Sequence, residues 1–252
     1  MTVVAAFYCT DGVVIAADSM ITPSMGNLFV GNHKRKKVEI LAGSQVFAFA
    51  GDIGQAARFK IMADGAAGNI AEARHPLDYP LRLTQAMIQQ FSNTGIVGNQ
   101  IGVNTLLGYV HNGAHQCCVF EGALQPRLLD AAHYYVALGS GKLSADPFLR
   151  FVVDIFCKGG QPKVREAIFL STWVVQHAIE TSSGGVDGPI RIAVIERDSD
   201  RAFGTRELSH AEIDQHLQAV ESAGDALRNW QDEMLSGDAA RDAPTPPAAG
   251  AQ

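Results

Sequence analysis

TVVAAFYCTDGVVIAADS, the stretch from Thr2 to Ser19, places two apolar, β-branched runs on either side of an Asp-Gly pair at 11–12. Asp-Gly between such runs is typical of a two-residue type I′ turn, so the pattern predicts a β-hairpin. Folding the chain back at this turn returns Asp18 to the end of the ribbon where Thr2 begins, with an offset of about three residues or ~10 Å. A threonine and a carboxylate are therefore expected close together in space.

Thr2 carries two catalytic groups if Met1 is removed, which is usual when a small residue follows it. An unperturbed α-amine has a pKa of roughly 7.7–8.0, so part of it is unprotonated near neutral pH and can accept the hydroxyl proton. An N-terminal amine is one recognised way to activate a threonine hydroxyl. Thr2 is therefore a candidate nucleophile that brings its own base.

A second hairpin is expected from strands at 37–41 and 45–50, which bring Lys37 and Gly51 to a common end. The strands of both hairpins are nearly continuous apolar runs, which is typical of a sheet covered on both faces. Lys37 also closes a basic run, and such a run is usually a solvated surface. The sequence alone therefore leaves a catalytic and a purely surface role open for Lys37.

The rest of the chain predicts strands and helices without regular βαβ alternation, which by itself indicates a generic α+β domain. A capping box at Ser209 and Glu212 starts the last helix, and its apolar stripe is expected to pack on its own subunit. The remaining tail is too poor in large apolar residues to fold and is expected to be disordered. The expected strands are 103–111, 115–121, 132–138 and 189–195, and the expected helices are 53–67, 78–92, 143–158, 163–181 and 209–235.

Composition narrows the possible classes of function. Hydrophobic residues make up 47% of the chain, which supports a large core, and a net charge of −6 argues against a nucleic-acid partner. No apolar run approaches the ~18 residues that span a bilayer, and no signal peptide is recognised, so a cytoplasmic location is expected. The four cysteines lack metal or redox spacing, so buried structural thiols are expected, with no metal and no cofactor.

Six short motifs in order resemble those of proteasome β-type subunits over about residues 2–197. The stretch from Gly31-Asn32 to Lys37, with Phe49-Ala50-Gly51, is also similar to the bacterial HslV peptidase. Among the bacterial branches, the chain most resembles the proteasome homologue described in β-proteobacteria. The six motifs are the Thr at position 2, Asp18-Ser19, Lys37-Val38, Ala50-Gly51, Gly139-Ser140-Gly141 and Ser183-Gly184-Gly185.

This resemblance implies the fold of an N-terminal nucleophile (Ntn) hydrolase, a four-layer α-β-β-α sandwich of antiparallel sheets. We expect an Ntn domain at 2–205, a helical extension at 206–236 and a disordered tail at 237–252. HslV-like subunits are shorter, so the resemblance gives no role for the extension.

The resemblance also implies roles for single residues. Lys37, held in place by Asp18, would tune the amine and hydroxyl of Thr2. The N–H group of Gly51 would donate to the oxyanion, although a glycine needed only for a tight turn is the alternative. Ser140 would support the amine; its glycine-rich turn alone could equally be a plain connection or a phosphate cradle.

Two further supporting residues follow from the same resemblance, together with a substrate pocket. Ser183 would orient the amine, and Glu180 stands where the family has an Asp, so its carboxylate carries one extra methylene. The register with the family predicts a first specificity pocket that is partly apolar and holds one cation. Cleavage is then expected after apolar or acidic residues. The residues expected to border the pocket are Ile21, Arg35, Phe49 and Ile53.

The function implied is that of a threonine endopeptidase, which hydrolyses peptides or unfolded proteins inside a self-enclosing homo-oligomer of stacked rings. Two alternatives stay open: a small-molecule amidase of the same superfamily, and a non-catalytic ring scaffold. An ATP-dependent unfoldase as partner is also left open by the sequence.

Overall fold

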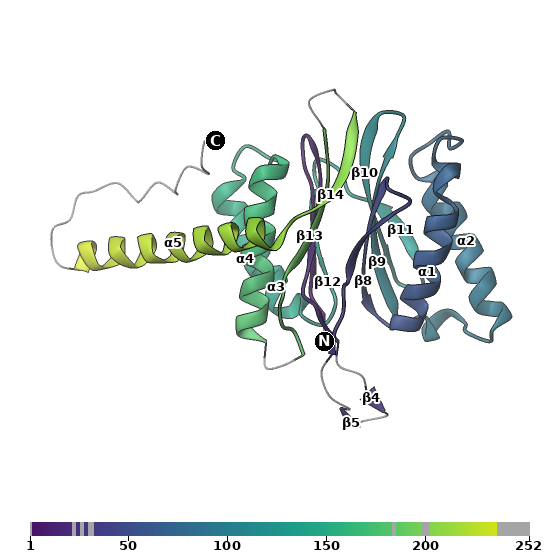
Figure 1. Cartoon of the computed structure of the whole chain (residues 1–252), viewed down its shortest axis with the longest axis horizontal. Helices are drawn as coiled ribbons and strands as arrows, with labels where there is room; N and C mark the ends of the chain where they lie inside the picture. The colour runs from purple at the N-terminus through teal and green to yellow at the C-terminus, as the bar shows by residue number, and fades with distance from the viewer. Residues whose placement is uncertain are drawn as a thin grey trace.

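The computed structural model describes residues 2–21, 24–25, 28–29, 33–182, 185–197 and 202–235. Two antiparallel sheets face each other in the middle of the molecule, α1 and α2 cover one outer face, and α3 and α4 cover the other (Figure 1). The expected α+β class and the four-layer α-β-β-α sandwich are thereby confirmed. The helices are α1 (Ile53–Gly65), α2 (Asp78–Asn93), α3 (Lys142–Phe156), α4 (Val164–Thr181) and α5 (His210–Leu235), with 3-10 turns η1 (Ala67–Ile70) and η2 (Gly98–Gln100).

The first sheet has the strand order β12-β1-β2-β13-β14. The sequence pattern missed β14, because this edge strand alternates half-buried with exposed residues and has no fully buried face. The expected domain boundary at 205 falls inside it. Its strands are β1 (Val4–Tyr8), β2 (Gly12–Ala17), β12 (Tyr135–Leu138), β13 (Arg191–Arg197) and β14 (Phe203–Glu207).

The second sheet has the order β11-β10-β9-β8-β7. β11 was also missed, because the sequence predicted a plain connection where Pro126 lies; an edge strand tolerates a proline that a central strand would not. Its strands are β7 (Val38–Leu41), β8 (Gln45–Gly51), β9 (Val103–His111), β10 (Ala114–Glu121) and β11 (Gln125–Leu128). Two small ribbons pair β3 (Met20–Ile21) with β6 (His33–Lys34), and β4 (Ser24–Met25) with β5 (Leu28–Phe29).

The first hairpin forms as predicted, but its turn and its register differ. A type I′ turn needs positive φ at both central residues, and neither Asp11 nor Gly12 has it. Gly12 is required for a different reason: a Cβ atom there would lie 2.0 Å from the carbonyl oxygen of Ile195. The longer loop pairs Val4 with Ala17, so the offset between the Thr2 and Asp18 ends is about one residue instead of three.

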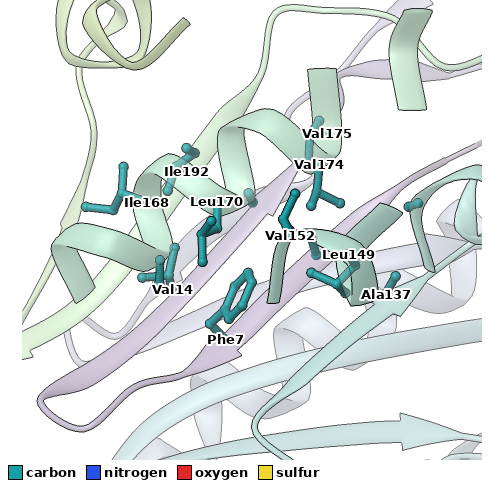
Figure 2. Packing of buried hydrophobic residues seen from close by; sticks show 14 of the residues in the cluster. Phe7, Val14, Ala137, Leu149, Val152, Ile168, Leu170, Val174, Val175 and Ile192 are labelled. Carbon is teal, nitrogen blue, oxygen red and sulfur yellow. The ribbon is translucent and has the colours of Figure 1, made fainter. Parts of the chain in front are cut away.

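Alternation along the strands divides the apolar side chains among three clusters. One cluster fills the space between the two sheets, and the other two lie between each sheet and its helices. Figure 2 shows the cluster under α3 and α4, where Phe7 of β1 and Val14 of β2 face Leu149 of α3 and Leu170 of α4. β1, β2 and β8 are therefore buried on two faces, as their continuous apolar runs predicted, whereas the edge strand β7 is only half-buried at Glu39 and Ile40.

The C-terminal helix α5 packs on the molecule over its first half, where Ile213 and Ala223 are buried. Its capping box is confirmed, since Ser209 and Glu212 exchange hydrogen bonds. Ile213 is buried beside α4, but Leu227 and Met234 are 49% and 53% exposed, and the helix projects beyond the helical layer (Figure 1). The predicted packing of the apolar stripe is wrong for this second half.

The four cysteines are free thiols and buried, as predicted. The expected tail at 237–252 lies outside the described residues. Among the helices of the described part of the chain, none has the length and apolar character needed to cross a membrane.

Candidate active site

Thr2, Lys37 and Asp18 form one connected group at the ends of β1, β2 and β7. The Nζ atom of Lys37 donates to both carboxylate oxygens of Asp18, at 2.8 Å each, and to Oγ1 of Thr2 at 3.0 Å. Lys37 is 1% exposed and Asp18 is 0% exposed, whereas Thr2 is partly accessible. The buried Lys37 ammonium thus contacts the Thr2 hydroxyl, and Thr2 is the member of the group that a substrate can reach.

Backbone amides fix the Asp18 carboxylate in this position. Oδ1 accepts from the N–H of Val3 and Oδ2 accepts from the N–H of Met20, each at 3.0 Å. The hairpin register makes this possible, because it places Asp18 directly beside the start of β1. Each carboxylate oxygen therefore has two donors, so the carboxylate holds Lys37 in one orientation.

Burial shifts the pKa values of both Lys37 and Asp18. Desolvation lowers the pKa of the Lys37 ammonium below its ordinary value, and the negative charge of Asp18 opposes that shift. Desolvation also raises the pKa of the Asp18 carboxyl, while Lys37 and the two amides oppose it. The site therefore holds a cation whose proton is more easily lost than that of a surface lysine.

The turn Gly139-Ser140-Gly141 supports Thr2 from the other side. The backbone N–H of Thr2 donates to Oγ of Ser140 at 3.2 Å, and the N–H of Gly141 donates to the Thr2 carbonyl at 2.9 Å. Gly139 has φ +90°, and a Cβ atom there would lie 2.2 Å from the Thr2 carbonyl oxygen. The glycine is needed because the turn must approach the Thr2 backbone this closely.

Gly51 is the last residue of β8 and lines the cavity beside Thr2. Its φ is +102°, and a Cβ atom would lie 2.1 Å from the carbonyl oxygen of Gly102. Asp52 then caps α1, because its side chain accepts from the N–H of Gln55 at 2.8 Å. The tight turn accounts for the glycine, and the same turn leaves Gly51 at the cavity wall.

A cavity of about 410 Å³ opens beside Thr2. Ile21, Phe49 and Ile53 are among the residues that line it, as expected for the specificity pocket. Arg35 does not line it: its side chain is exposed, while its backbone N–H donates to the Ser19 carbonyl at 2.8 Å. The expected pocket residues that line the cavity are therefore apolar, and the expected arginine is not among them.

One of the expected supporting residues, Glu180, is not brought to this group, and another, Ser183, lies outside the described residues. Glu180 is on α4, where its carboxylate accepts from Nε2 of Gln176 at 2.7 Å, and it lines a separate groove with Trp173 and with Leu217 of α5. The structure therefore places Glu180 beside the C-terminal helix and not beside Thr2.

The sequence reasoning missed several residues that line the cavity, namely Asn104, Glu121, Leu138 and Lys142. Lys142 follows the Gly-Ser-Gly motif directly, which is a signal that could have found it. Glu121 ends β10 directly after the apolar residues Val119 and Phe120, but nothing local indicates which site that strand end faces. Within the described ranges, no three His, Cys, Asp or Glu side chains group as a metal site would need.

No protein-family model and no curated protein sequence matches the chain. Among solved structures it is similar to a mutant of Anbu, a bacterial proteasome-like protein, from Hyphomicrobium sp. strain MC1, with 17% sequence identity and a TM-score of 0.68. The alignment covers 96% of this chain and 100% of the Anbu chain. At this identity the similarity shows the fold, which is the proteasome-like Ntn-hydrolase fold.

Proposed function

We propose that this chain is an N-terminal threonine peptidase, with Thr2 as nucleophile after removal of Met1. The observation that carries the proposal is the contact of the buried Lys37 ammonium with Oγ1 of Thr2, at 3.0 Å in the wall of a cavity. A lysine kept fully buried next to an accessible hydroxyl stabilises the alkoxide character of that hydroxyl.

The proposed reaction has two stages. Oγ of Thr2 attacks the peptide carbonyl, and its proton passes to the free α-amine of the same residue. The N–H of Gly51 donates to the oxyanion. The carbon–nitrogen bond then breaks, the leaving amine takes the proton, and an ester to Thr2 remains. Water attacks this ester, which releases the acid and restores the hydroxyl.

The supporting groups have separate roles in this proposal. Lys37 polarises Oγ1, and Asp18 fixes Lys37 through its four hydrogen bonds. Ser140 positions the nitrogen of Thr2. The apolar side chains that line the cavity, such as Ile21, favour an apolar side chain before the scissile bond. Ser183 and Glu180 remain predictions from the family resemblance, and the position of Glu180 gives no support to its role.

A peptide epoxyketone tests the proposal, because this warhead reacts with both the hydroxyl and the free amine of an N-terminal threonine. We expect intact-mass spectrometry to show a chain without Met1 that carries one adduct, and no adduct with Thr2→Ala. A chain that has lost Met1 and forms no adduct would contradict the proposal and support the non-catalytic scaffold. Retained Met1 would mean that the chain lacks the required amine.

Assembly into a homo-oligomeric ring belongs to the same proposal, and the proteasome-like fold supports it. Native mass spectrometry measures the number of subunits, and a monomer that hydrolyses small amides would favour the amidase alternative. The cytoplasmic location, the unfoldase partner and the β-proteobacterial branch stay predictions.

A further inference from the structure

The cavity beside Thr2 is also lined by residues that the proposed mechanism does not use. They are Asn104, Glu121 and Lys142, and we refer to them as the charged side of the cavity. Two of the three are ionisable, whereas Ile21, Phe49 and Ile53 are apolar. A substrate that fills the cavity therefore meets both apolar and ionisable groups.

Asn104 and Glu121 end two rows of side chains that otherwise belong to the core. Leu106 and Val119 stand two residues away on the same strand faces and are fully buried between the sheets. Thr105 pairs with Phe120, so the register places Glu121 opposite Asn104 in the neighbouring strand. The rows change from apolar to polar where they reach the cavity.

Lys142 lines the cavity from a helix that packs on the first sheet, whereas Asn104 and Glu121 belong to the second sheet. It is the first residue of α3 and lies two residues after Ser140, and it is half-buried. Glu121 already has a cation close by, because its carboxylate is 3.8 Å from Arg127, and Lys37 is engaged by Asp18. Lys142 forms no ion pair within the described part of the chain. Among the cations that line the cavity, its charge is therefore the one available to a substrate.

The position of the Thr2 nitrogen indicates which half of a substrate would reach Lys142. This nitrogen donates to Ser140, so the α-amine of the processed chain would lie on the Ser140 side of Thr2. In the proposed mechanism that amine delivers its proton to the leaving group. The leaving half of the peptide must then extend past Ser140, toward Lys142.

We propose that Lys142 selects peptides that carry an acidic side chain on the C-terminal side of the scissile bond. This inference rests on the proposed peptidase function and adds to it a preference for a negative charge on the leaving half of the peptide. An Asp or Glu side chain would occupy the charged side of the cavity and pair with the ammonium of Lys142. A lysine in the same place would meet that ammonium as a like charge.

Internally quenched peptides test this inference on the full chain. The peptides share one N-terminal half with an apolar residue before the bond, carry Asp, Asn or Lys after it, and are amidated so that only a side chain supplies the carboxylate. We expect kcat/KM for the Asp peptide to exceed that for the Lys peptide about fivefold, as for a partly exposed ion pair. Added salt should reduce this ratio, because it screens partly exposed charges.

Three variants separate a specific contact from the overall charge of the molecule. Lys142→Met should bring the Asp and Lys peptides to nearly equal kcat/KM, and Lys142→Glu should reverse their order. Lys158→Glu makes the same change of charge at an exposed lysine outside the cavity and should keep the wild-type ratio. Circular dichroism confirms that each variant is folded.

The outcomes distinguish this inference from the proposed function. An epoxyketone adduct on Thr2 together with equal cleavage of all three peptides would overturn the role of Lys142 and leave the peptidase proposal standing. A preference for Asp that Lys142→Glu leaves unchanged would also overturn it. Failure of both the adduct and the cleavage would overturn the function and this inference together.

Discussion

Two groups of charges in this protein each pair a basic side chain with carboxylates, but one group is buried and the other is exposed to solvent. Lys37 and Asp18 are 1% and 0% exposed, and each carboxylate oxygen accepts two hydrogen bonds. Arg206 of β14 pairs with Glu196 of β13 and with Glu212 at the start of α5. The Arg206 side chain is 43% exposed, and its partners are 33% and 41% exposed. Water surrounds the second group and is excluded from the first.

The comparison indicates what each group is for. A buried ion pair pays a desolvation penalty that can exceed its Coulombic attraction, so such a pair is weak evidence of stabilisation. A surface pair contributes only about 0–1 kcal/mol to stability. The buried pair therefore fits the chemistry proposed for Thr2, and the surface pair fits a modest ordering of α5.

The largest effect is expected from removing one partner of the buried pair. Lys37→Met should abolish the epoxyketone adduct and lower the free energy of unfolding by about 3–5 kcal/mol, because it leaves a carboxylate buried without its cation. Denaturant unfolding measures this loss. Combining it with Asp18→Asn should cost less than the sum of the two single changes, since no unpaired charge remains.

Lys36→Met is the matched control for that substitution. The neighbouring lysine is 43% exposed and pairs with Glu207 at the surface, so its removal should change stability by about 1 kcal/mol or less and leave the adduct intact. Equal losses of stability for Lys36→Met and Lys37→Met would contradict the contrast between buried and surface charges.

Asp18→Asn alone removes the other partner of the buried pair, and its effect on the reaction should depend on pH. Burial lowers the pKa of Lys37 from 10.5 and Asp18 opposes this, so an uncharged Asn should let the pKa fall further. The ammonium is then lost at a lower pH, and the alkaline decline in the rate of adduct formation should begin at a lower pH than in the wild type. Rates followed from neutral to alkaline pH test this, and an unmoved decline would show that Lys37 acts without its charge.

The smallest effect is expected at the surface group. Arg206→Ala removes both contacts to Glu196 and Glu212 but exposes no buried charge, so the free energy of unfolding should fall by about 1 kcal/mol or less. Thermal unfolding measures this loss of stability, and the rate of adduct formation measures any effect on the reaction at Thr2. A loss as large as that of Lys37→Met would mean that α5 is an integral part of the fold.

Much of the fold could be predicted because its signals are local. Asn112 and Gly113, between β9 and β10, both have the positive φ that such a dipeptide favours, and the cap at Ser209 forms as expected. Strands without a buried face gave no such signal, so β11 and β14 were missed. The register of the first hairpin was also wrong, because Gly12 is needed for contact with β13, a strand about 180 residues later.

The candidate site divides in the same way. Thr2, Asp18, Lys37, Gly51 and Ser140 were all proposed from the sequence, and the structure brings them together around one cavity or its floor. Arg35 and Glu180 matched the family register, yet one is exposed and the other faces α5. Register along a strand or helix does not determine which surface a side chain meets once the elements pack.

The sequence by itself determined the hairpins, the helix boundaries and the residue types that can perform threonine chemistry, because hydrophobic period, turn preference and capping act over a few neighbouring residues. Only the tertiary structure decided that Lys37 is buried against Asp18 and that Glu121 and Lys142 share a cavity with Thr2. It also decided that the loop of the first hairpin is longer than the two-residue turn expected from the sequence. These facts depend on how two sheets pack face to face. Packing is set by contacts between residues far apart in the chain, and no local pattern encodes it.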